Sequence, residues 1–133
     1  MIKALIFDMD DTLYDEKLYC RSGFAAVALH LSQYTGISND KIFKGLWHQF
    51  ETADRSRVFN AVLEKLGLTA DESLIWQLVE IYRSHRPRIS LEPAVKKILT
   101  DLKQNYHIAL LTDGYLPTQR LKAEALGLDK LCE

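Results

Sequence analysis

Two carboxylates near the N-terminus are the residues best placed to do chemistry. Asp8 and Asp10 lie two positions apart, directly after an apolar run from Ile2 to Phe7. Such a run, ended by polar residues, predicts a strand buried on both faces, and the period of two would send both acidic side chains to the same side. Neighbouring carboxylates repel each other unless a cation or a proton separates them. The pair therefore indicates a site for a hard divalent cation such as Mg²⁺, which prefers oxygen ligands.

The same two acids could divide the work of phosphoryl transfer. One carboxylate can attack phosphorus and form an aspartyl-phosphate. The other can protonate the leaving oxygen and then deprotonate the water that hydrolyses the intermediate. Asp11, the next acid along the chain, is interpreted as a turn residue, because aspartate favours turns.

A second group of polar residues ends the apolar run from His107 to Leu111. Thr112, Asp113 and Gly114 follow this run. The Thr112 hydroxyl could bond a phosphoryl oxygen, and so could backbone N–H groups that open a helix after it. Gly114 would let the backbone come close to a ligand, although Thr-Asp-Gly alone also fits an ordinary turn.

Helical periodicity dominates the sequence between the two motifs. Four apolar stripes between about Glu16 and His85 predict four short helices that form a small bundle. Thr69 and Glu72 have the spacing of a capping box before the fourth helix. The aromatic residues on these stripes are expected in the bundle core: Trp47, Phe50, Phe59, Trp76 and Tyr82.

The stretch from Pro87 to Pro93 interrupts the helical pattern and predicts a domain boundary. A helix is expected to begin at Pro93, and another to run from near Leu116 to Gly127. The order of elements is then strand, helical bundle, helix, strand, helix, which implies a parallel pair of strands. Lys122, on the last helix, is expected to face solvent.

The two motifs together resemble those of the haloacid dehalogenase superfamily. Ile6-Phe7-Asp8-Met9-Asp10-Asp11-Thr12-Leu13 is similar to the family's first motif, an apolar strand followed by Asp-x-Asp-x-Thr, and Ile108 to Gly114 is similar to the second. The resemblance implies an α/β fold with a Rossmann-type core over residues 1–15 and 88–133, incomplete with two parallel strands. It also implies a four-helix cap over residues 16–87.

The same resemblance implies roles for particular residues. It makes Asp8 and Asp10 catalytic and places both at a Mg²⁺ ion, and it favours a phosphatase over a dehalogenase because the second aspartate is present. The substrate would be a small phosphomonoester. Its phosphoryl group would be bound by the following residues: Thr12, Thr112, Asp113 and Gly114.

The family's third and fourth motifs supply a lysine and further acids, and the chain ends before them. An alternative follows, in which the chain is a truncated, catalytically impaired fragment. Such a fragment would act by binding a ligand or by self-association through the unpaired edges of its two-stranded sheet.

Composition narrows the class of partner and the location. The formal net charge is -1 and the basic residues are scattered, which argues against nucleic acid as a partner. The N-terminal apolar run is too short for a signal peptide or a membrane-spanning helix, so no membrane association is expected. Cys20 and Cys132 are expected to be free thiols in a reducing compartment, which suggests the cytoplasm.

Overall fold

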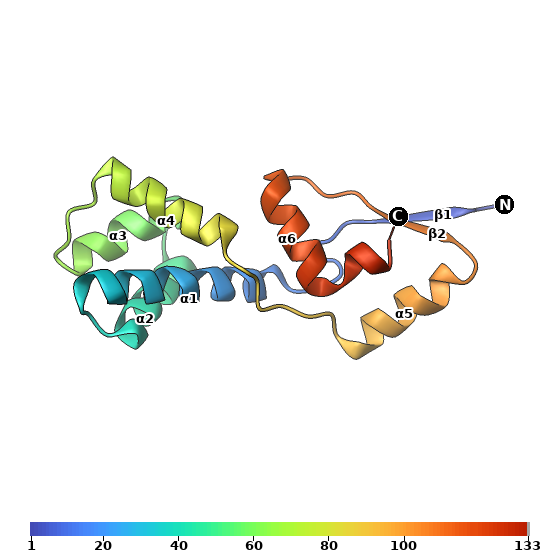
Figure 1. Ribbon diagram of the computed structural model, residues 1–133, viewed down its shortest axis with the longest axis horizontal. Coiled ribbons are helices and arrows are strands. Elements are labelled where there is room, and N and C mark those ends of the chain that lie inside the picture. The colour runs from blue at the N-terminus through green and yellow to red at the C-terminus, as the bar shows by residue number, and fades with distance from the viewer. Residues whose placement is uncertain (133) are drawn as a thin grey trace. The chain divides into compact units, whose positions relative to one another are not determined.

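A computed structural model describes residues 1–132 of the chain, which fold as two compact units (Figure 1). The core unit comprises Met1–Cys20 and the C-terminal segment from Arg86, and the helical unit comprises Arg21–His85. The mixed α/β architecture and the parallel pair of strands confirm the predicted fold class. The predicted domain limits at residues 15/16 and 87/88 stay a prediction.

The core unit is built on two parallel strands, β1 (Ala4–Phe7) and β2 (His107–Leu110). The register pairs Ala4 with His107 and Phe7 with Leu110, so the two strands end at the same level. The amide of Leu111 extends the pairing by donating to the carbonyl of Phe7 at 2.9 Å. The residues that follow both strands therefore lie at one edge of the sheet.

Two helices and a short 3-10 turn complete the core unit. Helix α5 (Pro93–Lys103) has its proline in the first turn, where the missing N–H costs no hydrogen bond. Helix α6 (Leu116–Leu126) ends at Gly127, whose φ of 72° is the left-handed conformation that commonly terminates a helix, and η2 (Leu128–Lys130) follows. The buried apolar residues of this unit include Met9, Leu13, Leu99, Ile108, Leu126 and Leu128.

Strand β1 is less buried than its sequence predicts. Ile6 is 65% exposed, and Leu111, just past the end of β2, is 72% exposed. The prediction that β1 is buried on both faces is wrong for the described residues, because no element within residues 1–132 covers the face that carries Ile6. The apolar run is therefore suited to a more enclosed position than it occupies here.

The helical unit contains the four predicted helices. They are α1 (Glu16–Thr35, whose first residues belong to the core unit), α2 (Asn39–Thr52), α3 (Val58–Lys65) and α4 (Glu72–Ser84), with the short η1 (Arg55–Arg57) before α3. The ring of Phe24 contacts those of Trp47, Phe50, Phe59 and Tyr82. The apolar core around this cluster includes Val27, Leu31, Ile42, Leu46, Val62, Leu63 and Leu78.

Two expectations about the helical unit are wrong. The cap of α4 is Asp71 rather than Thr69: the Asp71 carboxylate accepts a hydrogen bond from the amide of Leu74 at 2.8 Å. Trp76 does not join the core but is 56% exposed, since Leu78 occupies the buried side of α4. The helical period is correct, but it does not by itself determine which side of the helix is buried.

Both cysteines are free thiols, as predicted. Within residues 1–132, no helix is both long enough and apolar enough to cross a lipid bilayer.

Candidate active site

The loop after β1 folds back tightly around Met9. The Met9 side chain is fully buried, and its carbonyl accepts hydrogen bonds from the amides of Leu13 at 3.0 Å and Thr12 at 3.3 Å. Asp11 has a φ of 54°, and its Oδ1 accepts a hydrogen bond from the amide of Glu16 at 2.9 Å. Its interpretation as a turn residue is confirmed, because aspartate tolerates the left-handed region and can bond the local backbone.

Asp10 lies at the centre of a polar group that we call the Asp10 cluster: Asp10, Tyr14, Glu16, Gln119 and Lys122. Asp10 Oδ1 accepts hydrogen bonds from the Tyr14 hydroxyl at 2.6 Å and from Lys122 Nζ at 2.9 Å. Asp10 Oδ2 accepts from Gln119 Nε2 at 2.9 Å and from the same Nζ at 3.0 Å. Helix α6 thus supplies two of the donors to the acid that follows β1.

The side chain of Lys122 is buried, contrary to the expectation from the sequence. Its side chain is only 4% exposed, so the prediction of a solvent-facing lysine is wrong. Besides Asp10, Nζ contacts Glu16 Oε1 at 3.1 Å and lies 4.4 Å from the centre of the Tyr19 ring. A buried ammonium needs such paired charges, because an isolated charge away from water is costly.

Gln119 links the first motif to the second. Its Nε2 donates to Asp10 Oδ2, to Thr112 Oγ1 at 2.7 Å and to the carbonyl of Asp113 at 3.0 Å. Gly114 has a φ of 119°, and a Cβ at this position would lie 3.5 Å from Gln119 Cδ. A glycine therefore suits this turn on conformational grounds, since an added Cβ would make only ordinary contact with Gln119.

The pKa of Asp10 reflects opposing influences of the cluster. Burial alone would raise the pKa of this carboxyl, but hydrogen bonds from Gln119, Tyr14 and Lys122, together with the charge of Lys122, hold the pKa below its ordinary value. Burial and the neighbouring carboxylate raise the pKa of Tyr14. Burial also raises the pKa of Tyr19 to about 12. At neutral pH Asp10 is therefore a carboxylate beside the neutral phenol of Tyr14, and the neutral phenol of Tyr19 lies beside Lys122.

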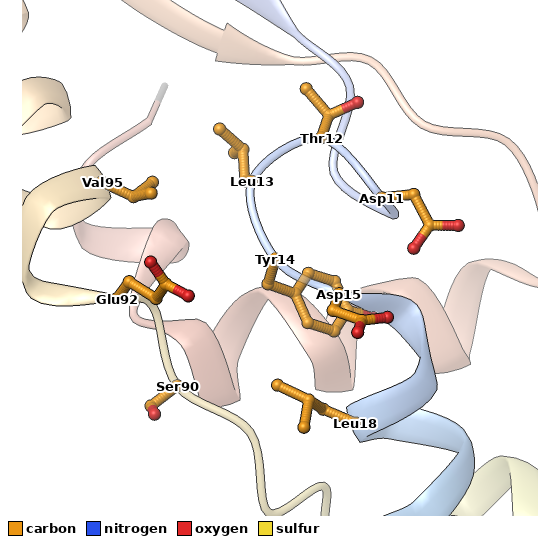
Figure 2. Close-up of a pocket in the computed structure, with 9 residues that line it drawn as sticks. All are labelled: Asp11, Thr12, Leu13, Tyr14, Asp15, Leu18, Ser90, Glu92 and Val95. Carbon is orange, nitrogen blue, oxygen red and sulfur yellow. The ribbon is translucent and has the colours of Figure 1, made fainter.

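Asp8 and Thr12 lie outside this hydrogen-bond network. Asp8 is exposed, and its Oδ1 accepts a hydrogen bond from the amide of Met9 at 2.7 Å. Thr12 lines a cavity of about 440 Å³ beside the loop, with walls from α1, α5 and the segment before α5 (Figure 2). Its lining residues are Asp11, Thr12, Leu13, Tyr14, Asp15, Leu18, Ser90, Glu92 and Val95, so neither Asp8 nor Thr112 faces it.

The predicted site residues are thus partly assembled. Asp10 and Thr112 accept hydrogen bonds from the same nitrogen, and Asp113 joins them through its carbonyl. Asp8 follows the same strand end. Gln119 and Lys122 were not foreseen as part of the site. A signal for them exists in the sequence: they are three positions apart and share a helix face directly after the second motif.

The donor set can be compared with the needs of a divalent cation. Within residues 1–132, no group of three or more His, Cys, Asp or Glu side chains is arranged to hold a metal ion. The Asp10 carboxylate is already occupied by its hydrogen bonds, so its contribution to a cation would come from its main-chain oxygen. Asp8 is then the carboxylate after β1 whose side chain is exposed to a cation, and the chemistry of a carboxylate and a carbonyl oxygen is the kind that Mg²⁺ prefers, with water as the remaining ligands.

The family of the protein follows from comparison with known sequences. The sequence model of haloacid dehalogenase-like hydrolases matches residues 2–132, and the chain belongs to this family. Among curated proteins, N-acylneuraminate-9-phosphatase from Homo sapiens is 30% identical over an alignment of 139 positions, gaps included, which covers 93% of this chain and 56% of that protein. The chain therefore spans little more than half the length of the curated relatives it matches.

Solved structures agree with this assignment. The HAD-hydrolase YfnB from Bacillus subtilis, in a crystal structure bound to magnesium, is 26% identical with a TM-score of 0.58, covering 99% of this chain and 61% of that one. L-2-haloacid dehalogenase from Xanthobacter autotrophicus has a TM-score of 0.51 at 20% identity, covering 100% of this chain and 55% of that one. At this identity the second structure supports the fold alone.

Proposed function

We propose that this chain carries the nucleophile and the acid–base residue of a Mg²⁺-dependent phosphatase that hydrolyses a small phosphomonoester. The observation that carries the proposal is the junction of the two motifs, where Asp10 and Thr112 share the Gln119 amide at the common end of β1 and β2. Similarity to N-acylneuraminate-9-phosphatase supports a sugar phosphate as the substrate class. The free thiols Cys20 and Cys132 support a reducing compartment such as the cytoplasm.

In the proposed reaction, an oxygen of Asp8 attacks phosphorus, and the bond from phosphorus to the ester oxygen breaks. Asp10 gives a proton to the departing oxygen and later takes one from the water that hydrolyses the aspartyl-phosphate. Each transfer requires the hydrogen bond from the Tyr14 hydroxyl to open, because it occupies a lone pair of Asp10 Oδ1. Thr112, Asp113, Gly114 and Thr12 are proposed to bind the phosphoryl oxygens. Mg²⁺, held by the Asp8 carboxylate and the Asp10 carbonyl, would offset negative charge at the reacting centre.

Hydrolysis of para-nitrophenyl phosphate in the presence of Mg²⁺ tests this proposal. Asp8→Asn should abolish turnover, because the amide oxygen is a poor nucleophile. Asp11→Asn is the matched control, since asparagine keeps the turn conformation and the oxygen that bonds the Glu16 amide. Equal rates in the wild type and Asp8→Asn would remove Asp8 from the mechanism. Loss of turnover on omission of Mg²⁺ is expected for the wild type.

A second candidate function is a catalytically impaired fragment that self-associates. The observation in its favour is the apolar surface at the sheet, where Ile6 and Leu111 are largely exposed. Exposed apolar side chains beside an unpaired strand edge favour association. Sedimentation velocity of the purified chain distinguishes the candidates: a dimer that Ile6→Lys dissociates supports association, and a monomer over a wide concentration range contradicts it.

A further inference from the structure

The hydrogen bonds on Asp10 leave its side chain little freedom. Its carboxylate accepts four hydrogen bonds, two from Lys122 and one each from Tyr14 and Gln119. An ionised carboxylate offers about four lone-pair positions, so these donors fill its capacity. Rotation of the Asp10 side chain would break several of these bonds at once.

The hydrogen-bonding capacity of the Lys122 ammonium is also filled. An ammonium has three N–H groups, and Nζ makes three contacts, two to the Asp10 oxygens and one to Glu16. The Tyr19 ring adds a favourable contact with the cation. Because fully satisfied polar networks in a low-dielectric region are rigid, Lys122 has one well-defined position between the loop after β1 and the first turn of α1.

Gln119 adds the connection to the second motif. It is 6% exposed, and its amide reaches Asp10, Thr112 and Asp113. The position of Asp10 is therefore fixed with respect to Thr112, which follows the other strand. Neither Gln119 nor Lys122 belongs to the two sequence motifs themselves.

We propose that Lys122 and Gln119 are positioning residues for the proposed phosphatase reaction: Lys122 fixes the orientation of the Asp10 side chain, and Gln119 fixes its placement relative to Thr112. The inference rests on the proposed role of Asp10. It predicts that Lys122 acts on catalysis through Asp10 and contributes little to substrate binding, whereas Gln119, which also bonds Thr112, affects both. A purely structural lysine that ties α6 to α1 would instead affect stability without acting through Asp10.

A kinetic double-mutant cycle separates these possibilities. Lys122→Met should lower kcat for para-nitrophenyl phosphate by about 10- to 100-fold, the loss expected from a displaced catalytic group, with little change in KM. In an Asp10→Asn background the same substitution should cause no further loss, because the group that it positions is gone. Lys122→Arg should recover part of kcat, since it restores a cation that can bond both carboxylates.

The control variant is Lys96→Met, an identical chemical change at an exposed lysine of α5, which should leave kcat unchanged. Equal fold losses from Lys122→Met in the wild-type and Asp10→Asn backgrounds would overturn the inference, as would an unchanged kcat. If far-UV circular dichroism shows that Lys122→Met does not fold, Lys122→Gln, which keeps a neutral donor near Asp10, takes its place in the same cycle with the same direction of effect.

Nuclear magnetic resonance tests the geometry without any need for turnover. In the wild-type chain at low temperature, the Lys122 ammonium should give a slowly exchanging ¹H–¹⁵N signal with a coupling across the hydrogen bond to the Asp10 carboxylate carbon, and Lys96 should give neither. Absence of that coupling would refute the positioning of Asp10 by Lys122. A wild-type chain that shows the coupling but no turnover would refute the proposed phosphatase function. The hydrogen bond between Lys122 and Asp10 would still be confirmed.

Discussion

Two glycines inside helices of the helical unit should respond to the same substitution with opposite signs. Gly23 lies in α1, and a Cβ at this position would fall 2.5 Å from both Cδ2 and Cε2 of the Tyr82 ring. Gly45 lies in α2, and its Cβ would meet nothing closer than Val62 Cγ1 at 3.7 Å. The first distance requires a displacement, whereas the second is an ordinary van der Waals contact.

The Tyr82 ring has limited room to move away from a new methyl group. Its centre lies 5.3 Å from that of Phe24, 6.1 Å from that of Phe59 and 6.2 Å from that of His85. The His85 ring is itself held, with Nδ1 2.6 Å from the Tyr82 carbonyl and Nε2 3.0 Å from Ser22 Oγ. Movement of Tyr82 would therefore disturb the aromatic cluster.

The expected magnitudes follow from two opposing effects. Replacing glycine by alanine in a helix interior stabilises the fold by about 1 kcal/mol through backbone entropy. Overpacking a filled region costs about 1–3 kcal/mol. For Gly23→Ala we expect overpacking to prevail, with a net loss of up to about 2 kcal/mol in the free energy of unfolding. For Gly45→Ala we expect a gain of about 0.5–1 kcal/mol.

Urea unfolding monitored by tryptophan fluorescence measures both effects, because Trp47 and Trp76 both lie in the helical unit. The midpoint should fall for Gly23→Ala and rise for Gly45→Ala, with similar m-values in all three proteins. A stabilised Gly23→Ala variant would refute the close packing of α1 against Tyr82. If Gly45→Ala is destabilised as much as Gly23→Ala, the distance from the new Cβ to its nearest neighbour does not determine whether the substitution raises or lowers the free energy of unfolding.

Three further predictions address the pH dependence, the caps and the core. Burial lowers the pKa of His85 below the ordinary value of 6.5, so the free energy of unfolding should decrease as the pH falls below 6.5, and His85→Gln should reduce this decrease in urea titrations at several pH values. Asp71→Ala should cost about 1 kcal/mol by removing the cap of α4, whereas Thr69→Ala should change the urea midpoint very little. Ile108→Ala should destabilise the core unit by about 2–5 kcal/mol, measured by thermal unfolding with far-UV circular dichroism, because the side chain is 1% exposed.

The order of elements was predictable because each depends on local pattern. The four helical stripes, Pro93 at a helix start and Gly127 at a helix end all correspond to elements in the structure. Burial was less predictable, since it depends on what covers a face. Trp76 lies on a correctly predicted helix and yet faces solvent, and Ile6 lies on a correctly predicted strand with one open side.

The two motifs were recognisable because the residues of each are close together in the sequence. Asp8 and Asp10 follow one strand and Thr112 follows another, and parallel strands bring such positions to one edge. The partners of Asp10 could not be found in the same way. Lys122 is 112 positions away from it, and no local rule relates the two.

The prediction that Lys122 faces solvent was wrong because of the composition of α6. A lysine on a helix normally faces water, because burying an unpaired ammonium is unfavourable. On α6 the buried side carries Thr118, Gln119, Lys122 and Leu126, so the helix packs a largely polar face against the loop after β1. Burial of this polar face is stable only because the carboxylates of Asp10 and Glu16 neutralise the charge of Lys122. The acid to which we assign the proton transfer is therefore also the acid that makes burial of Lys122 tolerable, and a substitution at Asp10 or Lys122 changes the pair.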